Sequence, residues 1–275
     1  MIIGDWLQKA TETLKQAEIR SARLDAELIL SHTLRKPRTY LHAHGEDTLD
    51  ARQEEIANAR LQLRLDYTPI AYIVGHKEFY GRRFITTPAA LIPRPETEAL
   101  IDLFATTVPQ TLPLIKDKRR IVDVGTGTGA IGITVKKEWP DFDVTLTDTS
   151  SHALQLACKN ASKLQADVNY FQGDLLHGYA APVDTIIANL PYVNKSWEVS
   201  PEVHLEPELA LYAHDNGLAL IRRLIAQAAH LLVPGGALIL ESDERQHAQI
   251  IQDTARHGFT HQATQGLAQL YTKKP

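Results

Sequence analysis

The chain has 275 residues, of which 44% are hydrophobic and 23% are charged, a composition typical of a globular protein. A net charge of −4 argues against a chain-wide basic surface for nucleic acid, and the single cysteine, Cys158, excludes an intrachain disulfide. No apolar run approaches the roughly 20 residues that span a bilayer, and the histidines show no metal-ligand spacing, so we expect no membrane span and no metal site.

The first part of the chain has the pattern of helices. Apolar side chains recur at helical spacing in three stretches within residues 3–65, the second after Ser21 and the third after Asp50. We therefore expect a small helical bundle over residues 1–74. Nothing in it looks catalytic, and the pattern does not decide between a structural role and the binding of a partner.

The pattern changes near residue 68. Residues 71–75 and 79–85 are rich in β-forming side chains, which predicts a hairpin connecting the bundle to the rest of the chain, residues 75–275. Pro95 is suited to the first position of a helix, which we expect to run to about Thr107. A loop is expected over residues 109–118.

From residue 119 onward, strands and helices alternate. Apolar runs predict strands at 120–124, 144–147, 168–171, 184–188 and 237–240, with helices between them and weaker strands near 259–263 and 268–272. This alternation predicts an α/β fold with a parallel, Rossmann-like sheet covered by helices on both faces. A ligand in such a sheet lies beyond the carboxyl ends of the strands.

A glycine-rich turn follows the first of these strands. Gly125, Gly127 and Gly129 alternate with Thr126 and Thr128 before a predicted helix, whose first N–H groups are free to bind a ligand. A P-loop would end in Gly-Lys-Ser or Gly-Lys-Thr, and a dinucleotide site prefers G-x-G-x-x-G; this turn matches neither. A ligand-free tight connection remains open as the alternative.

Acidic residues end the next two strands. Asp148 ends the second, where a carboxylate can accept hydrogen bonds from both hydroxyls of a ribose. Alternatively, Asp148 caps the helix that follows, as Ser150 can. Asp174 ends the third strand, within reach of an adenine amino group, and the alternative for it is an ordinary turn aspartate.

The most specific pattern is Asn189-Leu190-Pro191-Tyr192, which follows the nearly apolar strand at 184–188. A buried asparagine amide needs partners, because an unmet polar group costs roughly 1–3 kcal/mol. Pro191 holds Leu190 extended, so the Leu190 carbonyl can face the same space as the Asn189 side chain. Two acceptors then suit a planar NH₂ group, against which Tyr192 can stack. The alternative is an ordinary β-turn.

Together these stretches resemble the HemK-type (PrmC family) glutamine N5-methyltransferases. The resemblance covers most of residues 69–241 and runs through residues 69–75, 78–81, 123–131, 148–154, 206–211 and 235–236. It also includes the stretch Leu91-Ile92-Pro93-Arg94-Pro95-Glu96-Thr97-Glu98. This chain has Leu190 where the family usually has proline, and Leu175 where relatives often have an aromatic residue.

The resemblance implies a class I S-adenosylmethionine-dependent methyltransferase. It implies a helical substrate-recognition domain over residues 1–74, then a hairpin linker and methyltransferase domain over 75–275. The implied reaction moves a methyl group from S-adenosylmethionine to the side-chain amide nitrogen (N5) of the glutamine in the Gly-Gly-Gln motif of class I peptide chain release factors. We expect this in the cytoplasm, without direct nucleic-acid binding.

The resemblance also implies which residues form the site. The catalytic residues would be Asn189, Leu190, Pro191 and Tyr192. The residues implied for S-adenosylmethionine are Gly125, Thr126, Gly127, Thr128, Gly129, Asp148, Asp174, Leu175 and Asn189.

Two other functions remain to be weighed. A DNA adenine N6-methyltransferase shares the Asn-x-Pro-Tyr pattern, but it must flip a base out of the stack, and no separate basic, aromatic-rich domain is visible. A non-catalytic binding module that kept the cofactor fold is the other alternative, and the departure at Leu190 is its only support.

Overall fold

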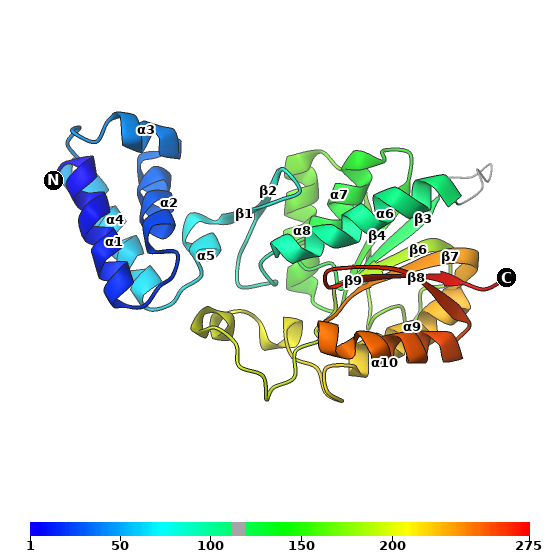
Figure 1. Ribbon diagram of the computed structural model, residues 1–275. Coiled ribbons are helices and arrows are strands. Elements are labelled where there is room, and N and C mark those ends of the chain that lie inside the picture. The colour runs from blue at the N-terminus through cyan, green and yellow to red at the C-terminus, as the bar shows by residue number, and fades with distance from the viewer. Residues whose placement is uncertain (112–118) are drawn as a thin grey trace. The chain divides into compact units, whose positions relative to one another are not determined.

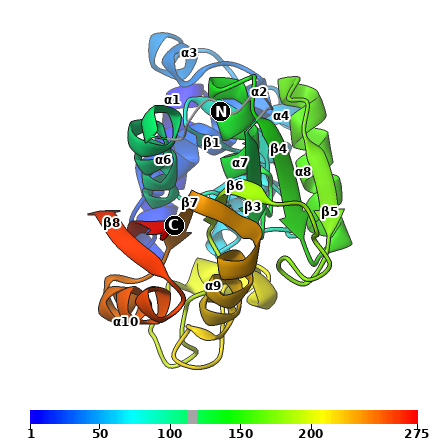
Figure 2. The same ribbon diagram turned by 90° about the vertical axis from the view of Figure 1, so that its right-hand side faces the viewer.

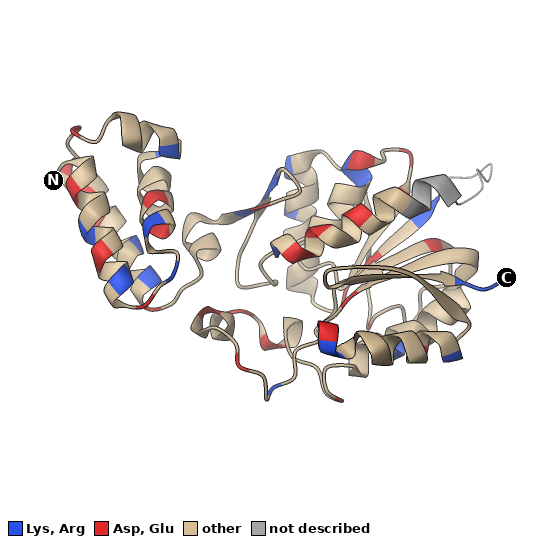
Figure 3. Ribbon diagram, in the orientation of Figure 1, with Lys and Arg blue, Asp and Glu red and all other residues tan. Residues whose placement is uncertain are grey.

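A computed structural model describes residues 1–111 and 119–275 of the chain. The chain divides into two compact units (Figure 1). The first unit consists of Met1–His76 and Val199–Leu205, and the second of Lys77–Glu198 and Glu206–Pro275. Figure 3 shows acidic and basic residues interspersed over both units. Within the described residues, no helix has the length and apolar character needed to cross a membrane.

The first unit is built from helices, which confirms the predicted helical bundle. Asp50 forms a capping box with Gln53 at the start of α4, as expected of an aspartate at that position. Apolar side chains from α1, α2 and α3, among them Trp6, Leu30 and Leu41, form a buried core. The helices are α1 (Ile3–Gln16), α2 (Ala22–Leu34), α3 (Arg38–Ala43), α4 (Ala51–Leu65) and α5 (Ile70–Val74).

A buried arginine joins distant parts of this unit. The Arg64 side chain is 1% exposed, and its Nε donates to Asp25 Oδ2 across 2.7 Å. Another of its nitrogens pairs with Glu202, which belongs to the second segment of the unit. Because a buried guanidinium is costly without partners, Arg64 explains why the segment Val199–Leu205 packs with the N-terminal helices.

The connecting hairpin exists, but the prediction that residues 71–75 form its first strand is wrong. Those residues lie in and just after α5, which Gly75 ends in the left-handed conformation at φ 75°. The hairpin instead pairs β1 (His76–Phe79) with β2 (Arg82–Ile85). Local β-propensity failed here because burial of Ala71 and Val74 on one face of a short helix outweighs it.

The second unit contains a seven-stranded sheet in the order β5-β4-β3-β6-β7-β9-β8 (Figure 2). Five neighbouring strands are parallel, from β5 to β7. The strands are β3 (Arg120–Val124), β4 (Asp143–Asp148), β5 (Asn169–Gln172), β6 (Val183–Ala188), β7 (Leu232–Glu241), β8 (Phe259–Gln265) and β9 (Ala268–Lys273).

Helices cover both faces of this sheet, as predicted (Figures 1 and 2). Alternate strand residues face opposite sides, so Ile187 of β6 packs with α6, α7 and α8, whereas Ile186 packs with α9 and α10. The helices are α6 (Glu98–Thr111), α7 (Ala130–Glu138), α8 (Ser151–Leu164), α9 (Ala219–Leu231) and α10 (Glu244–Arg256).

Two details differ from the expected layout. The sheet is mixed, because β9 runs antiparallel to both of its neighbours. The turn at Gly266, where φ is 54°, leaves too few residues for a crossover and therefore makes a hairpin. In addition, α6 extends to Thr111, so the first residues of the loop expected at 109–118 are helical. The rest of that expected loop, 112–118, lies outside the described residues.

Candidate active site

The glycine-rich turn and the Asn189 segment lie side by side. Val124 of β3 pairs with Ala188 of β6, so the residues that follow each strand meet at the same sheet edge. A Cβ placed on Gly125 would lie 2.9 Å from Leu190 Cδ2, and the φ of Gly125 is 72°. The positive φ favours glycine, and the short distance shows how closely the two segments approach.

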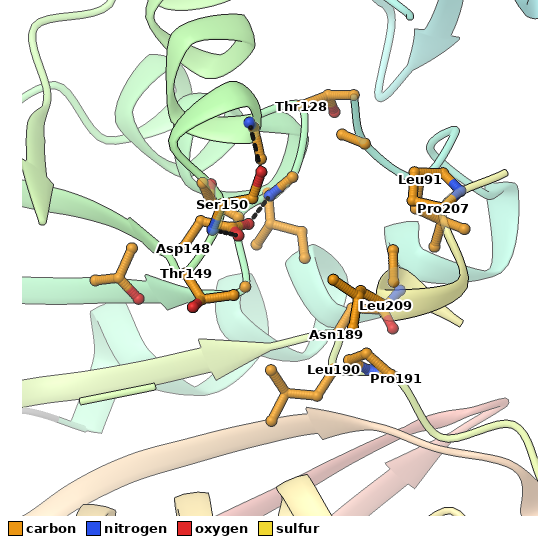
Figure 4. Close-up of a pocket in the computed structure, with 18 of the residues that line it drawn as sticks. Leu91, Thr128, Asp148, Thr149, Ser150, Asn189, Leu190, Pro191, Pro207 and Leu209 are labelled. Carbon is orange, nitrogen blue, oxygen red and sulfur yellow. Dashed lines mark hydrogen bonds between the residues drawn. The ribbon is translucent and has the colours of Figure 1, made fainter. Parts of the chain in front are cut away.

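A pocket opens beyond this sheet edge (Figure 4). Ten of the sequence-predicted site residues line it: Gly125, Thr126, Gly127, Thr128, Asp148, Asp174, Leu175, Asn189, Leu190 and Pro191. The described wall does not include the other two, Gly129 and Tyr192. Gly129 instead begins α7, at φ 83°. The remaining wall comes mainly from residues 89–94 and from Pro207, Leu209 and Ala210.

Asp148 ties the end of β4 to the glycine-rich turn. Its Oδ2 accepts a hydrogen bond from Gly127 N at 3.0 Å, and its Oδ1 accepts one from Ser150 N at 2.9 Å (Figure 4). Burial raises the pKa of this carboxyl, and the backbone donors partly offset that effect. Ser150, rather than Asp148, caps α8, because its Oγ accepts from Ala153 N. Each Asp148 oxygen thus has an acceptor site left for a ligand hydroxyl.

Asp174 and Leu175 form another part of the pocket wall. Asp174 is exposed, and its Oδ2 lies 2.5 Å from Arg223 Nη2 in a surface ion pair. Leu175 is 8% exposed and has a φ of 55°, which is unusual for a leucine. Its buried side chain supplies apolar surface to the wall at the end of β5, whereas the Asp174 carboxylate is shared with solvent and Arg223.

The amide of Asn189 is held from behind. Its Nδ2 donates to Thr97 Oγ1 across 3.0 Å, while Tyr192 Oη donates to Glu241 Oε1 across 3.1 Å. Burial and the nearby Glu241 carboxylate raise the pKa of Tyr192 well above its ordinary value. Tyr192 therefore stays a neutral hydrogen-bond donor. Its hydroxyl is engaged by Glu241, which is 2% exposed.

Sequence reasoning missed three residues that organise the site: Thr97, Glu206 and Glu241. Glu206 is 5% exposed; its Oε2 accepts from Ile92 N at 3.0 Å, and its Oε1 pairs with Arg94. This contact joins the two segments that form the wall opposite the glycine-rich turn. Thr97 and Glu206 both lie in stretches that carry the resemblance, so the sequence indicated that these stretches matter. It did not indicate which residues Thr97 and Glu206 contact.

The arrangement fits a ligand that combines a sugar, an apolar ring and a reactive group. Asp148 and the backbone N–H groups at the start of α7 suit hydroxyl and other polar groups, and Leu175 suits a flat apolar one. Asn189 places a side-chain amide at the far end of the same pocket. No cluster of three His, Cys, Asp or Glu side chains within residues 1–111 and 119–275 is suited to hold a metal ion.

Comparison with known proteins gives matches along the chain. Residues 5–75 match the PrmC N-terminal domain, and residues 97–206 match the methyltransferase small domain. The release factor glutamine methyltransferase of Deinococcus radiodurans is 39% identical over 261 residues, covering 94% of this chain and 92% of that protein. The protein of the same name from Escherichia coli strain K12 is 35% identical over 261 residues, which cover 92% of this chain and 90% of that protein.

Solved structures with low sequence identity share the fold. A methyltransferase from Pyrococcus furiosus has a TM-score of 0.54 at 16% identity, covering 79% of this chain and 98% of that one. A 16S rRNA N2 G1207 methyltransferase from T. Thermophilus, solved with AdoMet and guanosine, has a TM-score of 0.51 at 16% identity. The match covers 73% of this chain and 50% of that one. With relatives above 30% identity over almost its whole length, this chain belongs to the release factor glutamine methyltransferase family.

Proposed function

We propose that this protein transfers a methyl group from S-adenosylmethionine to the side-chain amide nitrogen of the glutamine in the Gly-Gly-Gln motif of class I peptide chain release factors. One observation carries the chemical part of this proposal. Asn189 lines the same pocket as Asp148 and the glycine-rich turn, so an amide acceptor and a nucleoside-type site share one cavity.

The cofactor half of the pocket would hold S-adenosylmethionine through several contacts. We assign the ribose hydroxyls to the free acceptor sites of Asp148, and the adenine ring to the wall that contains Leu175. The backbone of residues 125–129 can approach a ligand closely, because the glycines there have no side chain and take positive φ values. We assign Asp174 to the amino group at the edge of the adenine ring. This contact would compete with the ion pair between Asp174 and Arg223.

The substrate half orients an amide nitrogen. When bound, S-adenosylmethionine supplies an electrophilic methyl group on a sulfonium. An amide nitrogen is a poor nucleophile, so the main contribution of this chain is to hold it in line, about 3–3.5 Å from the methyl carbon. We assign this role to Asn189 Oδ1 and the Leu190 carbonyl, which accept the two N–H bonds and stabilise the positive charge that grows on nitrogen.

The remaining residues of the Asn-x-Pro-Tyr segment shape this half of the site. Pro191 keeps the Leu190 carbonyl turned toward the pocket. Tyr192, anchored through its hydroxyl on Glu241, is the flat surface that we assign to the amide plane. The electron pair of the broken C–S bond would stay on sulfur, giving S-adenosylhomocysteine, and the nitrogen would lose its proton to water after the methyl group arrives, so no side chain is assigned as a general base.

We further propose that the first unit recognises the release factor and contributes little to the cofactor site. The reaction would then take place in the cytoplasm, where release factors act, without direct binding of this chain to nucleic acid. Its helices display the exposed large apolar side chains Leu24, Ile56, Leu63 and Leu205, which are 42%, 36%, 48% and 48% exposed. We assign these side chains to contacts with a protein partner, because the core of a protein interface is apolar, whereas binding to nucleic acid depends mainly on basic groups.

A labelling experiment tests the proposal. The purified protein is incubated with S-adenosylmethionine labelled in the methyl group and with a release factor, duplex DNA, or nothing. Label on the release factor, at the glutamine by mass spectrometry, is expected, and a release factor with glutamate at that position should stay unlabelled. Label on DNA would support an adenine methyltransferase instead. Cofactor binding without any labelling would support a non-catalytic module.

A further inference from the structure

A buried carboxylate lies next to Asn189 because of the sheet register. Ala188 of β6 pairs with Leu240 of β7, so the next residues along, Asn189 and Glu241, are neighbours on the same face. Glu241 is 2% exposed and is not part of the described pocket wall. Its side chain is shielded from solvent and lies beside Asn189, so it can act on Asn189 from behind.

Three side chains gather around this carboxylate. Tyr192 Oη donates to Glu241 Oε1 across 3.1 Å, and the Asn189 amide donates to Thr97 Oγ1 across 3.0 Å. Glu241 Oε2 is buried and has no hydrogen-bond partner among the described residues. Burial raises the pKa of Glu241, and the Thr97, Tyr192 and Asn189 side chains lower it, as donors next to an anion do. Burial has the larger effect, so the pKa of Glu241 lies above its ordinary value, and the neighbouring donors offset part of that shift.

An ionised Glu241 would give this network a direction. A carboxylate only accepts, so the Thr97 hydroxyl would turn its proton toward Glu241 and keep its own oxygen free to accept from the Asn189 amide. The nitrogen of the Asn189 amide then faces Thr97, as observed, and its oxygen Oδ1 is directed away. Without the carboxylate, an asparagine amide can flip and present nitrogen instead of oxygen at nearly the same place.

We propose that Glu241, acting through the Thr97 hydroxyl, is a positioning residue that keeps Asn189 Oδ1 directed at the substrate nitrogen. This inference rests on the proposed function, since it explains why the pocket accepts an NH₂ donor. A flipped Asn189 would present its own NH₂ group to the substrate NH₂, and two donors repel. Neither Glu241 nor Thr97 takes part in bond making; both set the orientation of a residue that does.

Steady-state kinetics test the positioning role. Thr97→Val keeps the shape of the side chain and removes the hydroxyl, so we expect kcat for methylation of a release factor to fall by about 10- to 100-fold. KM for the release factor and Kd for S-adenosylmethionine should change little, because the hydroxyl oxygen is already engaged by the Asn189 amide. Thr97→Ser restores the hydroxyl and should restore most of kcat. Glu241→Gln should resemble Thr97→Val.

The matched control is Thr185→Val. Thr185 lies on β6, the strand that leads to Asn189, and is fully buried with no hydrogen-bond partner for its Oγ1 among the described residues. The same change there should leave kcat at the wild-type value. A wild-type kcat in Thr97→Val, or a loss of kcat equal in Thr97→Ser and Thr97→Val, would overturn the proposal. The threonine variants decide the question even if Glu241→Gln fails to fold.

A second measurement is independent of activity. In ¹⁵N-labelled protein without ligands, the side-chain NH₂ signals of Asn189 are identified by their absence in Asn189→Ala. We expect slowed hydrogen exchange of these protons in the wild-type protein and in Thr97→Ser, and fast exchange in Thr97→Val. Equal exchange in all three would overturn the positioning role. If the network is found but no release factor is methylated, the proposed function fails and the network stands.

Discussion

The backbone N–H of Gly127 donates a hydrogen bond to Asp148 Oδ2 across 3.0 Å, so the glycine-rich turn and the end of β4 are held together by one carboxylate. Asp148 thus has a structural contact in addition to its proposed contacts with ribose. Asp148 also accepts from Ser150 N at 2.9 Å, although Ser150 rather than Asp148 caps α8.

We predict that Asp148→Ala weakens S-adenosylmethionine binding. The variant loses two charge-assisted hydrogen bonds to the ribose, each worth about 1.5–3 kcal/mol. Isothermal titration calorimetry on the folded variant measures the change. The control is Asp243→Ala, which removes a helix-capping aspartate outside the described pocket wall and should cost about 1 kcal/mol of stability with unchanged affinity. Equal affinities in both variants would limit Asp148 to holding the turn.

The amide clamp gives a second prediction. Asn189→Ala removes one of two acceptors, so the target nitrogen keeps a site but loses its orientation, and turnover should fall by about 10²- to 10³-fold. Affinity for S-adenosylmethionine should change far less, because only its reactive end would touch Asn189. Single-turnover methylation of a release factor, together with calorimetry, measures both quantities. A wild-type rate would remove the clamp from the mechanism.

Leu190→Pro tests the backbone acceptor separately. Proline keeps the carbonyl and fixes φ, so turnover should be retained or improve. The structure adds a cost, because Leu190 is 4% exposed and would lose part of its packing in the core of the second unit. Each lost buried CH₂ group is worth about 0.8 kcal/mol, which a urea melt can measure. A folded variant without activity would exclude the Leu190 carbonyl as an acceptor.

Much of the site follows from pattern alone, because parallel strands bring their carboxyl ends to one edge. That rule predicted that the stretches after β3 and β6 meet, and Gly125 and Leu190 are indeed in close approach. Thr97 and Glu241 were missed because their contacts depend on strand register and on the packing of α6, which no local pattern specifies. The helical residues 71–74 were missed for a related reason: an apolar run fits a short buried helix as well as a strand.

The first unit should affect the protein substrate and leave the cofactor untouched. We predict that the double change Leu24→Ser and Leu63→Ser lowers kcat/KM for an intact release factor, because both leucines are exposed apolar side chains of this unit. Methylation of a short peptide containing Gly-Gly-Gln should not change. Tyr170→Ser is the control, since Tyr170 is 42% exposed but lies on β5 of the second unit. Equal losses on peptide and protein would argue against a recognition role.

The last prediction concerns Asp123, which is buried at the end of β3 beneath the glycine-rich turn. Its Oδ2 accepts hydrogen bonds from Thr126 Oγ1 at 2.6 Å and Gly132 N at 2.9 Å, and its Oδ1 has no partner among the described residues. Burial raises the pKa of this carboxyl from 3.8 to about 6, against the effect of the two donors. The folded protein therefore binds a proton more tightly here than the unfolded chain does.

Because the folded pKa is the higher one, Asp123 favours the folded state below about pH 4, and this contribution is lost as the pH rises to about 6. At pH 7 the buried charge costs about 2 kcal/mol relative to pH 4, because the unfolded carboxyl is already partly ionised at pH 4. Asp123→Asn carries no charge at this position. Its free energy of unfolding, relative to that of the wild type, should therefore rise by about the same amount from pH 4 to pH 7. Urea melts of both proteins at pH 4 and pH 7 measure the difference, in which titrations at other sites cancel. A difference that stays constant with pH would mean that Asp123 titrates normally in the folded protein.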